Sequence, residues 1–333
     1  MSSALTLRAA ITRGALVSLA NWPVIVIDLV IESVYKAAIA VPVFGAAFMV
    51  ALLLGADVGS LLGDGVLSAA DRMLVPLGQS PVALVAFLGA LFATGVGGEV
   101  LMFIAKAGTF SVLVAGERAA GDIQRAPVRL SAVRTASAYS LAAVLAAARR
   151  FRARAMSLAV WLAAAYVGVI GGYLVVVVYG FQWAASSAWA PAWPLLVLLA
   201  TSAGVVSLTA ANLLFDLLRV VVISDDCRLS VAWRRVRTFL LADARQVLGI
   251  FGAMAAVLAV ATIASITAAA GLALIAWAPL VGLIVLPLQV AFWIVRGLVY
   301  QYAGLTTLSA YQAQYRRFSA PTRAAVPLQV HEA

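Results

Sequence analysis

Residues 156–215 read MSLAVWLAAAYVGVIGGYLVVVVYGFQWAASSAWAPAWPLLVLLATSAGVVSLTAANLLF and contain no charged side chain. One helix needs only about 20 apolar residues to cross the ~30 Å hydrocarbon core of a bilayer. This stretch therefore predicts two membrane-spanning helices joined by a tight turn. The turn is expected between Gln182 and Pro194, because polar residues, prolines and tryptophans gather there and indole rings favour the headgroup level of a membrane.

A second long uncharged stretch, residues 246–295, predicts another hairpin, which bends near Gly271, Trp277 and Pro279. Two shorter uncharged stretches, 37–56 and 73–98, each fit one span. The expected spans are 34–54, 81–104, 157–181, 193–217, 247–268 and 279–302. The predicted fold class is all-α: a polytopic six-helix transmembrane bundle, with residues 1–318 as a single membrane domain and 319–333 as a polar C-terminal tail.

The composition supports this class and excludes several functions. Of the 333 residues, 65% are hydrophobic and 11% are charged, and the mean hydropathy is +1.06, whereas soluble domains carry about 25% charged residues. The one cysteine, Cys227, and the one histidine, His331, cannot build a disulfide, a Cys/His metal cluster or a Ser/His/Asp triad. The sequence contains no P-loop, HExxH or GxSxG motif. We therefore expect no cofactor, no metal and no enzymatic activity.

The arginines predict the orientation of the chain. With an even number of spans, eighteen of them fall on one side of the membrane and only Arg72 falls on the other. The eighteen are Arg8, Arg13, Arg118, Arg125, Arg129, Arg134, Arg149, Arg150, Arg152, Arg154, Arg228, Arg234, Arg235, Arg237, Arg245, Arg316, Arg317 and Arg323. Because cytoplasmic loops are enriched in basic residues, both termini are expected in the cytoplasm. Abundant alanine and only two lysines indicate a bacterium with a GC-rich genome, and hence its inner membrane.

Two arginine clusters precede predicted spans and are candidate contacts for anionic lipid headgroups. They are Arg149, Arg150 and Arg152, and Arg234, Arg235 and Arg237. Each cluster is expected on an amphipathic helix in the cytoplasmic interface, with arginines toward phosphates and Phe, Leu or Trp toward acyl chains. The simpler alternative is that these arginines only fix the topology. Since the net charge of +10 is juxtamembrane, no nucleic acid is expected as a partner.

Eight charged residues fall within or near the predicted spans and form a candidate intramembrane polar cluster. They are Asp28, Glu32, Lys36, Glu99, Lys106, Asp216, Arg219 and Arg296. Ionisable groups are costly inside a bilayer and usually face the bundle interior or water. One interpretation is a lock: a charge-neutral network of acids and bases that holds the helices together. The other is a cytoplasm-facing cavity for a headgroup, an ion or a small polar solute, with Arg219, Arg296 and Lys106 available for an anion and Glu99 or Asp216 as proton carriers.

Beyond the sixth span, Leu305, Leu308, Tyr311 and Tyr315 recur at helical spacing. The last helix is therefore expected to continue into the cytoplasm with one apolar, aromatic face. That face is expected to pack on the chain's own interfacial helices or, alternatively, to dock a partner.

Three stretches resemble a known group of proteins: FSVLVAG at 110–116, NLLFDLLRVVVISDD at 212–226 and LSVAWRRVRTF at 229–239. They are similar to segments of poorly characterised bacterial six-helix membrane proteins, which are themselves similar to the membrane domain of some glycerophosphodiester phosphodiesterases. Only Asp216 and Arg219 match as motif positions. The resemblance implies a fold and a role near lipid or envelope biology. It implies no phosphodiesterase activity, because this chain has no such domain.

Three functions remain open from the sequence. The first is a non-enzymatic integral membrane protein: a scaffold, accessory protein or complex subunit in an envelope or lipid process, with a protein partner or a second copy of itself. The alternative is a transporter or lipid-handling protein that uses the polar cluster. The third is an enzyme that acts on a membrane-embedded substrate.

Overall fold

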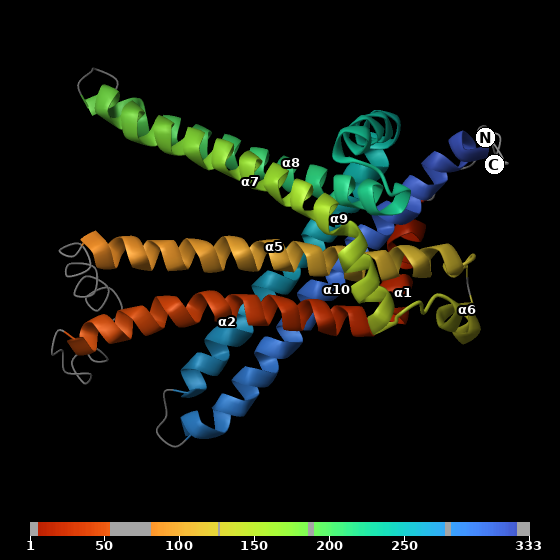
Figure 1. The fold of residues 1–333 in the computed structure, drawn as a ribbon, viewed down its shortest axis with the longest axis horizontal. Helices are drawn as coiled ribbons and strands as arrows, with labels where there is room; N and C mark the ends of the chain where they lie inside the picture. The colour runs from red at the N-terminus through yellow and green to blue at the C-terminus, as the bar shows by residue number, and fades with distance from the viewer. Residues whose placement is uncertain (1–5, 54–80, 126, 186–189, 277–280, 325–333) are drawn as a thin grey trace.

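The computed structural model describes residues 6–53, 81–125, 127–185, 190–276 and 281–324, and all the regular secondary structure within them is helical (Figure 1). The helices are α1 (Leu7–Ala20), α2 (Trp22–Leu53), α5 (Pro81–Ala119), α6 (Leu130–Thr135), α7 (Leu141–Ala185), the short 3-10 helix η1 (Ala190–Ala192), α8 (Trp193–Asp225), α9 (Leu229–Ala276) and α10 (Val281–Ala324). The predicted all-α class is confirmed.

The long helices form three hairpins. Helices α2 and α5, α7 and α8, and α9 and α10 pack as pairs. All three pairs start from one shared end of the molecule, where α1 and α6 lie, and diverge from it (Figure 1). The turn predicted between Gln182 and Pro194 is narrowed by α7, which runs to Ala185, and by α8, which begins at Trp193. The second turn was wrongly expected to begin at Gly271, because α9 continues through it to Ala276. Residues 54–80, 186–189, 277–280 and most of the predicted tail lie outside the described residues.

Within the described residues, four helices are long and apolar enough to cross a membrane: Gly89–Ala119, Leu141–Ala184, Trp193–Asp225 and Leu229–Ile275. A fifth is added if α1 and α2, which meet at 78°, count as one broken span. Helix α10, which contains most of the sixth predicted span, is not among these four over the described residues. The structure thus has four to five candidate spans, and the predicted number of six is not confirmed.

The break between α1 and α2 lies at Asn21, whose φ of −111° and ψ of 39° are not helical. Pro23 follows in the first turn of α2, where its missing N–H costs no intrahelical hydrogen bond. The buried Asn21 side chain donates from Nδ2 to the carbonyl oxygens of Val17 and Ala136, at 2.9 Å each. Its Oδ1 accepts from the Ala138 N–H at 2.8 Å. One side chain therefore fixes the bend and ties it to the segment between α6 and α7.

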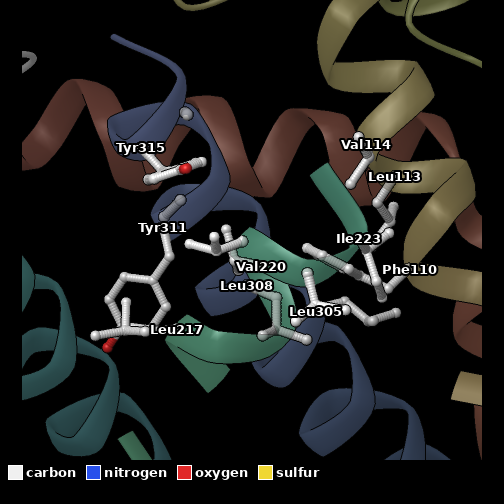
Figure 2. Packing of buried hydrophobic residues seen from close by; sticks show 14 of the residues in the cluster. Phe110, Leu113, Val114, Leu217, Val220, Ile223, Leu305, Leu308, Tyr311 and Tyr315 are labelled. Carbon is white, nitrogen blue, oxygen red and sulfur yellow. The ribbon is translucent and has the colours of Figure 1, made fainter. Parts of the chain in front are cut away.

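The hydrophobic core gathers buried side chains of α5, α8 and α10 (Figure 2). Phe110 and Leu113 of α5 and Leu217 of α8 are almost fully buried. The predicted apolar face of α10 belongs to this core, since Leu305, Leu308, Tyr311 and Tyr315 are all buried. In contrast, none of the most apolar stretch of α7 is buried within the chain. The arms of the hairpins thus present apolar side chains outward, as a bilayer requires.

A buried ion pair fastens α1 to α5 at the shared end. Arg13 Nε lies 2.7 Å from Glu117 Oε1, and both side chains are less than a tenth exposed. The Arg13 guanidinium also donates to Gln124 Oε1 at 2.7 Å and to the Gly121 carbonyl oxygen. From α10, Arg316 Nη1 donates to the Glu117 carbonyl oxygen at 2.8 Å. Glu117 therefore joins three helices, although Arg13 was predicted only as a topology signal.

The predicted interfacial helices are only partly correct. Arg149–Arg152 is not on a separate helix, because α7 runs without a break from Leu141 to Ala185. The segment that carries Arg234–Arg237 is set off from the rest of α9 by non-helical dihedral angles at Asp243. Of the two aromatic side chains in these clusters, Phe151 is buried in the core, whereas Trp233 is 42% exposed. Both segments are amphipathic, but their apolar faces pack on the protein.

Gly14 marks the closest approach of α1 to α10. A Cβ at this position would lie 2.5 Å from the Thr306 carbonyl oxygen and 2.8 Å from the Ala310 nitrogen, and neither backbone atom can move freely. We expect Gly14→Ala to force the helices apart and to lower the free energy of unfolding by about 1–3 kcal/mol. Thermal unfolding in mild detergent measures the effect. The matched control is Gly204→Ala, where nothing lies within 4 Å. Equal unfolding temperatures for the two variants would contradict this packing.

Candidate functional site

The three hairpins line a partly open cavity of about 580 Å³. Its charged lining comes from Asp28 on α2, Lys106 on α5, and Asp216 and Arg219 on α8. The remaining lining is supplied by α9 and α10 and is largely apolar, with Phe251, Met254, Leu258, Leu305 and Leu308. We call this space the central cavity. The structure thus brings together four of the eight predicted cluster residues around one space.

Arg219 is held in place by neutral partners. Its Nη2 donates to the Lys106 carbonyl oxygen, and its guanidinium carbon lies 5.3 Å from the centre of the Phe110 ring. Only 9% of the residue is exposed. Among the described residues, no carboxylate oxygen lies within 4 Å of its side-chain nitrogens. The nearest acids that act on its charge, Asp28 and Asp216, line the same cavity without a direct ion pair, so the guanidinium has room for an anion.

Asp28 is the most deeply buried acid of the cluster, with 1% of the residue exposed. Its Oδ1 makes no hydrogen bond within the described chain. A buried carboxylate oxygen without a donor is costly, and such groups in proteins are usually satisfied. Because Asp28 lines the central cavity, a cation or a hydrogen-bond donor there would satisfy it.

Glu32 connects this cavity to a neighbouring one. Its Oε1 lies 2.8 Å from Lys36 Nζ, so the expected i, i+4 pair is present. Its Oε2 lies 3.4 Å from Lys106 Nζ and accepts a hydrogen bond from Gln301 Nε2. Glu32 therefore forms ion pairs with Lys36 and Lys106 and is hydrogen-bonded to α10 through Gln301.

The remaining two cluster residues lie in separate crevices. Glu99 lines an apolar crevice of about 560 Å³ between α5 and α7, together with Phe92, Phe103 and Tyr166. Arg296 lines another, of about 570 Å³, between α2 and α10. Its guanidinium carbon lies 5.2 Å from the Trp293 ring centre and 5.5 Å from that of Tyr300. The predicted cluster of eight is thus divided among three spaces: four residues line the central cavity, Glu32, Lys36 and Arg296 line the crevice between α2 and α10, and Glu99 lies apart.

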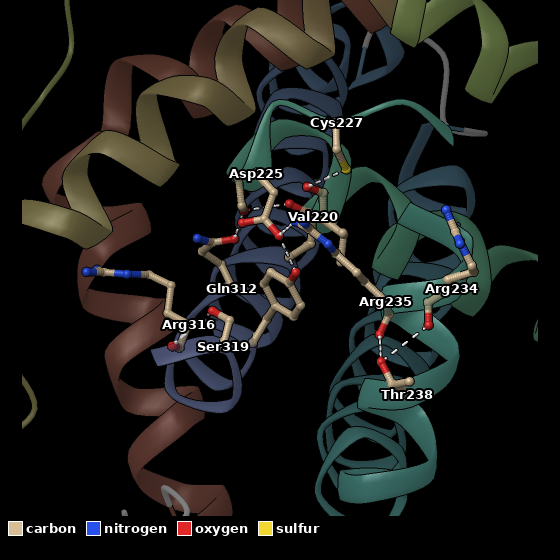
Figure 3. A network of polar contacts seen from close by, with 12 residues as sticks. Val220, Asp225, Cys227, Arg234, Arg235, Thr238, Gln312, Arg316 and Ser319 are labelled. Carbon is tan, nitrogen blue, oxygen red and sulfur yellow. Dashed lines mark hydrogen bonds and ion pairs between the residues drawn. The ribbon is translucent and has the colours of Figure 1, made fainter. Parts of the chain in front are cut away.

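Two of the six candidate lipid-binding arginines are engaged in ion pairs that close the turn between α8 and α9. Arg150 pairs with Asp226, the residue that ends α8 in the left-handed conformation. Arg235 pairs with Asp225, which also accepts from the Tyr315 hydroxyl (Figure 3). Arg234 points away from this network (Figure 3) and is exposed, as are Arg149, Arg152 and Arg237. Four arginines are therefore available to headgroups.

Sequence reasoning missed Gln301, Asp225 and Asp226. An uncharged glutamine gives no signal in a search for charges, and the two aspartates read as loop residues. One signal was present for Asp225: an acid at a helix end that is followed by basic residues indicates an ion pair across the turn, here with Arg235. Among the described residues, no group of three His, Cys, Asp or Glu side chains could hold a metal ion.

Together, the long apolar helices and the charges held between them define a multi-pass helical membrane protein. Comparison with protein families, with curated proteins and with solved structures finds no match for this chain. The resemblance carried by Asp216 and Arg219 therefore stays a prediction.

Proposed function

We propose that this chain is a lipid-handling membrane protein that holds the polar head of a membrane amphiphile in the central cavity. One observation carries the proposal: charged side chains from two hairpins line a single space whose other walls, from the third hairpin, are largely apolar. A ligand with a charged head and an apolar body matches both parts of such a wall.

The charges of the cavity favour a ligand over a lock. A lock requires each base to pair with an acid, because an unpaired charge is costly within a membrane. Here Lys106 pairs with Glu32, which lies outside the cavity lining, and Arg219 makes no close ion pair among the described residues. Asp28 Oδ1 has no donor. A phosphate near Arg219 and an amine or hydroxyl near Asp28 would complete the set.

We further propose the six-span topology in a bacterial inner membrane, with both termini in the cytoplasm. The arginine asymmetry supports it, and so does the arrangement of three hairpins that diverge from one shared end. Residues 281–302 of α10 contain only one charged residue, Arg296, which lies over two aromatic rings. In this topology the central cavity lies toward the cytoplasmic leaflet.

A second candidate is a non-enzymatic scaffold or subunit of an envelope complex. One observation favours it: the outer parts of α7 and α8 pack on each other and bury almost none of their most apolar stretches. Such an arm has room for a helix of a partner protein or of a second copy.

Native mass spectrometry of the protein purified in mild detergent separates these candidates. For lipid handling we expect a lipid adduct that Arg219→Gln weakens about tenfold, the usual cost of losing a charged hydrogen bond. Arg134→Gln is the matched control, because Arg134 is exposed and belongs neither to the cavity lining nor to the candidate headgroup contacts. A stoichiometric protein partner with no lipid adduct would instead favour the scaffold and contradict the proposal.

A further inference from the structure

The crevice between α2 and α10 adjoins the central cavity. Leu29, Glu32 and Lys36 of α2 face Trp293, Arg296 and Tyr300 of α10 across it. Gln301 lines both spaces. The two volumes, about 570 and 580 Å³, are therefore separated at this point by the side chain of Gln301 and its hydrogen-bond acceptor, Glu32.

The contact between Glu32 and Gln301 is the partition between these spaces. Glu32 binds Lys36, which lines the crevice, and Lys106, which lines the central cavity. Both side chains of the partition are long and rotatable, and neither is part of the helix backbone. A change of rotamer would join the two spaces without any movement of a helix, and the two lysines would keep Glu32 neutralised in either position.

The charge of the crevice differs from that of the central cavity. Lys36 and Arg296 face only one acid there, Glu32, whereas the central cavity has two acids and two bases. The Lys36 side chain is 71% exposed. Arg296 stacks over Trp293 and Tyr300, and among the described residues no carboxylate lies within 4 Å of its nitrogens. The net positive charge and the fixed guanidinium suit a phosphate.

We propose that the α2–α10 crevice is a phosphate-binding subsite through which the headgroup of an anionic phospholipid reaches the central cavity from the side. This inference rests on the proposed lipid-handling function and names its ligand class and its route. Lys36 and Arg296 bind the phosphate first. The Glu32–Gln301 partition then opens toward Lys106 and Arg219, and the acyl chains stay in the bilayer beside α2 and α10.

The test uses thiols introduced into the two spaces of the full-length protein. Ser33→Cys places one in the crevice and Ala259→Cys places one in the central cavity, and both native residues are exposed there. The background carries Cys227→Ser. Burial raises the pKa of the native Cys227 thiol, so that thiol reacts slowly, and its removal leaves one reporter for each variant. The readout is the alkylation rate in detergent with added dioleoyl phosphatidylglycerol.

We expect phosphatidylglycerol to slow alkylation at both positions. With Arg296→Gln, the lipid concentration needed to protect the Ser33→Cys thiol should rise about tenfold, because a charged hydrogen bond is lost. Arg134→Gln, at an exposed arginine outside both spaces and outside the candidate headgroup contacts, should leave that concentration unchanged. An unchanged concentration with Arg296→Gln would overturn the subsite. Equal protection by phosphatidylcholine would overturn the selection for anionic lipid, and equal protection by inorganic phosphate would overturn the lipid source.

A further variant distinguishes failure of this inference from failure of the proposed function. Gly304→Trp fills the central cavity, because Gly304 lines that cavity and nothing lies within 4 Å of its Cβ position. We expect it to abolish protection at Ala259→Cys and to preserve protection at Ser33→Cys. If Arg296→Gln removes protection at Ser33→Cys while Ala259→Cys stays protected, the lipid still binds in the central cavity and the lateral route is refuted. Protection at Ala259→Cys that persists with Gly304→Trp would refute the central site alone.

Discussion

Replacement of Glu117 by alanine is expected to lower the free energy of unfolding by about 3–5 kcal/mol, the usual cost of removing one partner of a buried ion pair. The substitution leaves the Arg13 guanidinium buried without the carboxylate oxygen that lies 2.7 Å from its Nε in the wild type. It also removes the charge that faces Arg316, whose Nη1 lies 3.8 Å from the same oxygen. Because Glu117 joins α1, α5 and α10, the shared end of the hairpins should loosen. Unfolding by increasing denaturant in mixed micelles measures the effect.

The matched control is Asp122→Ala, which removes another acid a few residues away. Asp122 pairs with Arg125 at 3.2 Å, but the two side chains are 53% and 80% exposed. Exposed pairs contribute about 0–1 kcal/mol. We therefore expect the unfolding midpoint of Asp122→Ala to stay near that of the wild type. If Glu117→Ala unfolds at the same midpoint as this control, the ion pair does not hold the helices together.

Gly304→Trp is expected to abolish lipid binding in the central cavity while it leaves the fold intact. The position lies within α10, where glycine is about 1 kcal/mol less favourable than alanine. Since nothing lies within 4 Å of the Cβ position, the larger side chain extends into the cavity without a clash at its base. The variant should therefore unfold no earlier than the wild type. A loss of binding without a loss of stability is the outcome that a purely structural charge cluster cannot give.

Two controls accompany this variant. Gly304→Ala also removes the glycine from α10 but adds only a methyl group, so it should keep the lipid. Gly168→Trp adds the same bulk at an exposed position of α7, a helix that supplies no residue to the lining of the central cavity. Nothing lies within 4 Å of the Cβ position there. It should also keep the lipid. If all three variants retain the lipid adduct measured by native mass spectrometry, the lipid binds elsewhere on the protein.

The helical class could be predicted from the sequence because uncharged stretches of span length report directly on helices in a bilayer. The bounds of the helices could not. Helix α2 begins at Trp22, twelve residues before the predicted span, and α5 continues to Ala119, fifteen residues beyond it. Both extensions pack in the core, where Val24 and Phe110 are buried. A helix that leaves the bilayer and enters a protein core gives no hydropathy signal at the point of exit.

The candidate site was predicted in part, for a similar reason. Spacing along one helix identified the Glu32–Lys36 pair, since i and i+4 are neighbours in any helix. The contacts of Glu32 with Lys106 and Gln301 join helices far apart in the chain, and no pattern of charges fixes which helices pack together. The same limit explains why Glu99 and Arg296 were grouped with a cavity that they do not line.

Photo-crosslinking locates a bound lipid most directly. A phosphatidylglycerol with a diazirine near its glycerol backbone would be incubated with the wild-type protein and irradiated, and the labelled peptides would be identified by mass spectrometry. We predict labels on the cavity side of α9 and α10, at Phe251, Met254, Leu258 or Leu308, and their loss with Gly304→Trp. Labels confined to exposed outer faces, such as Val167 and Leu174 of α7, would show that the charges between the hairpins hold helices and not a lipid.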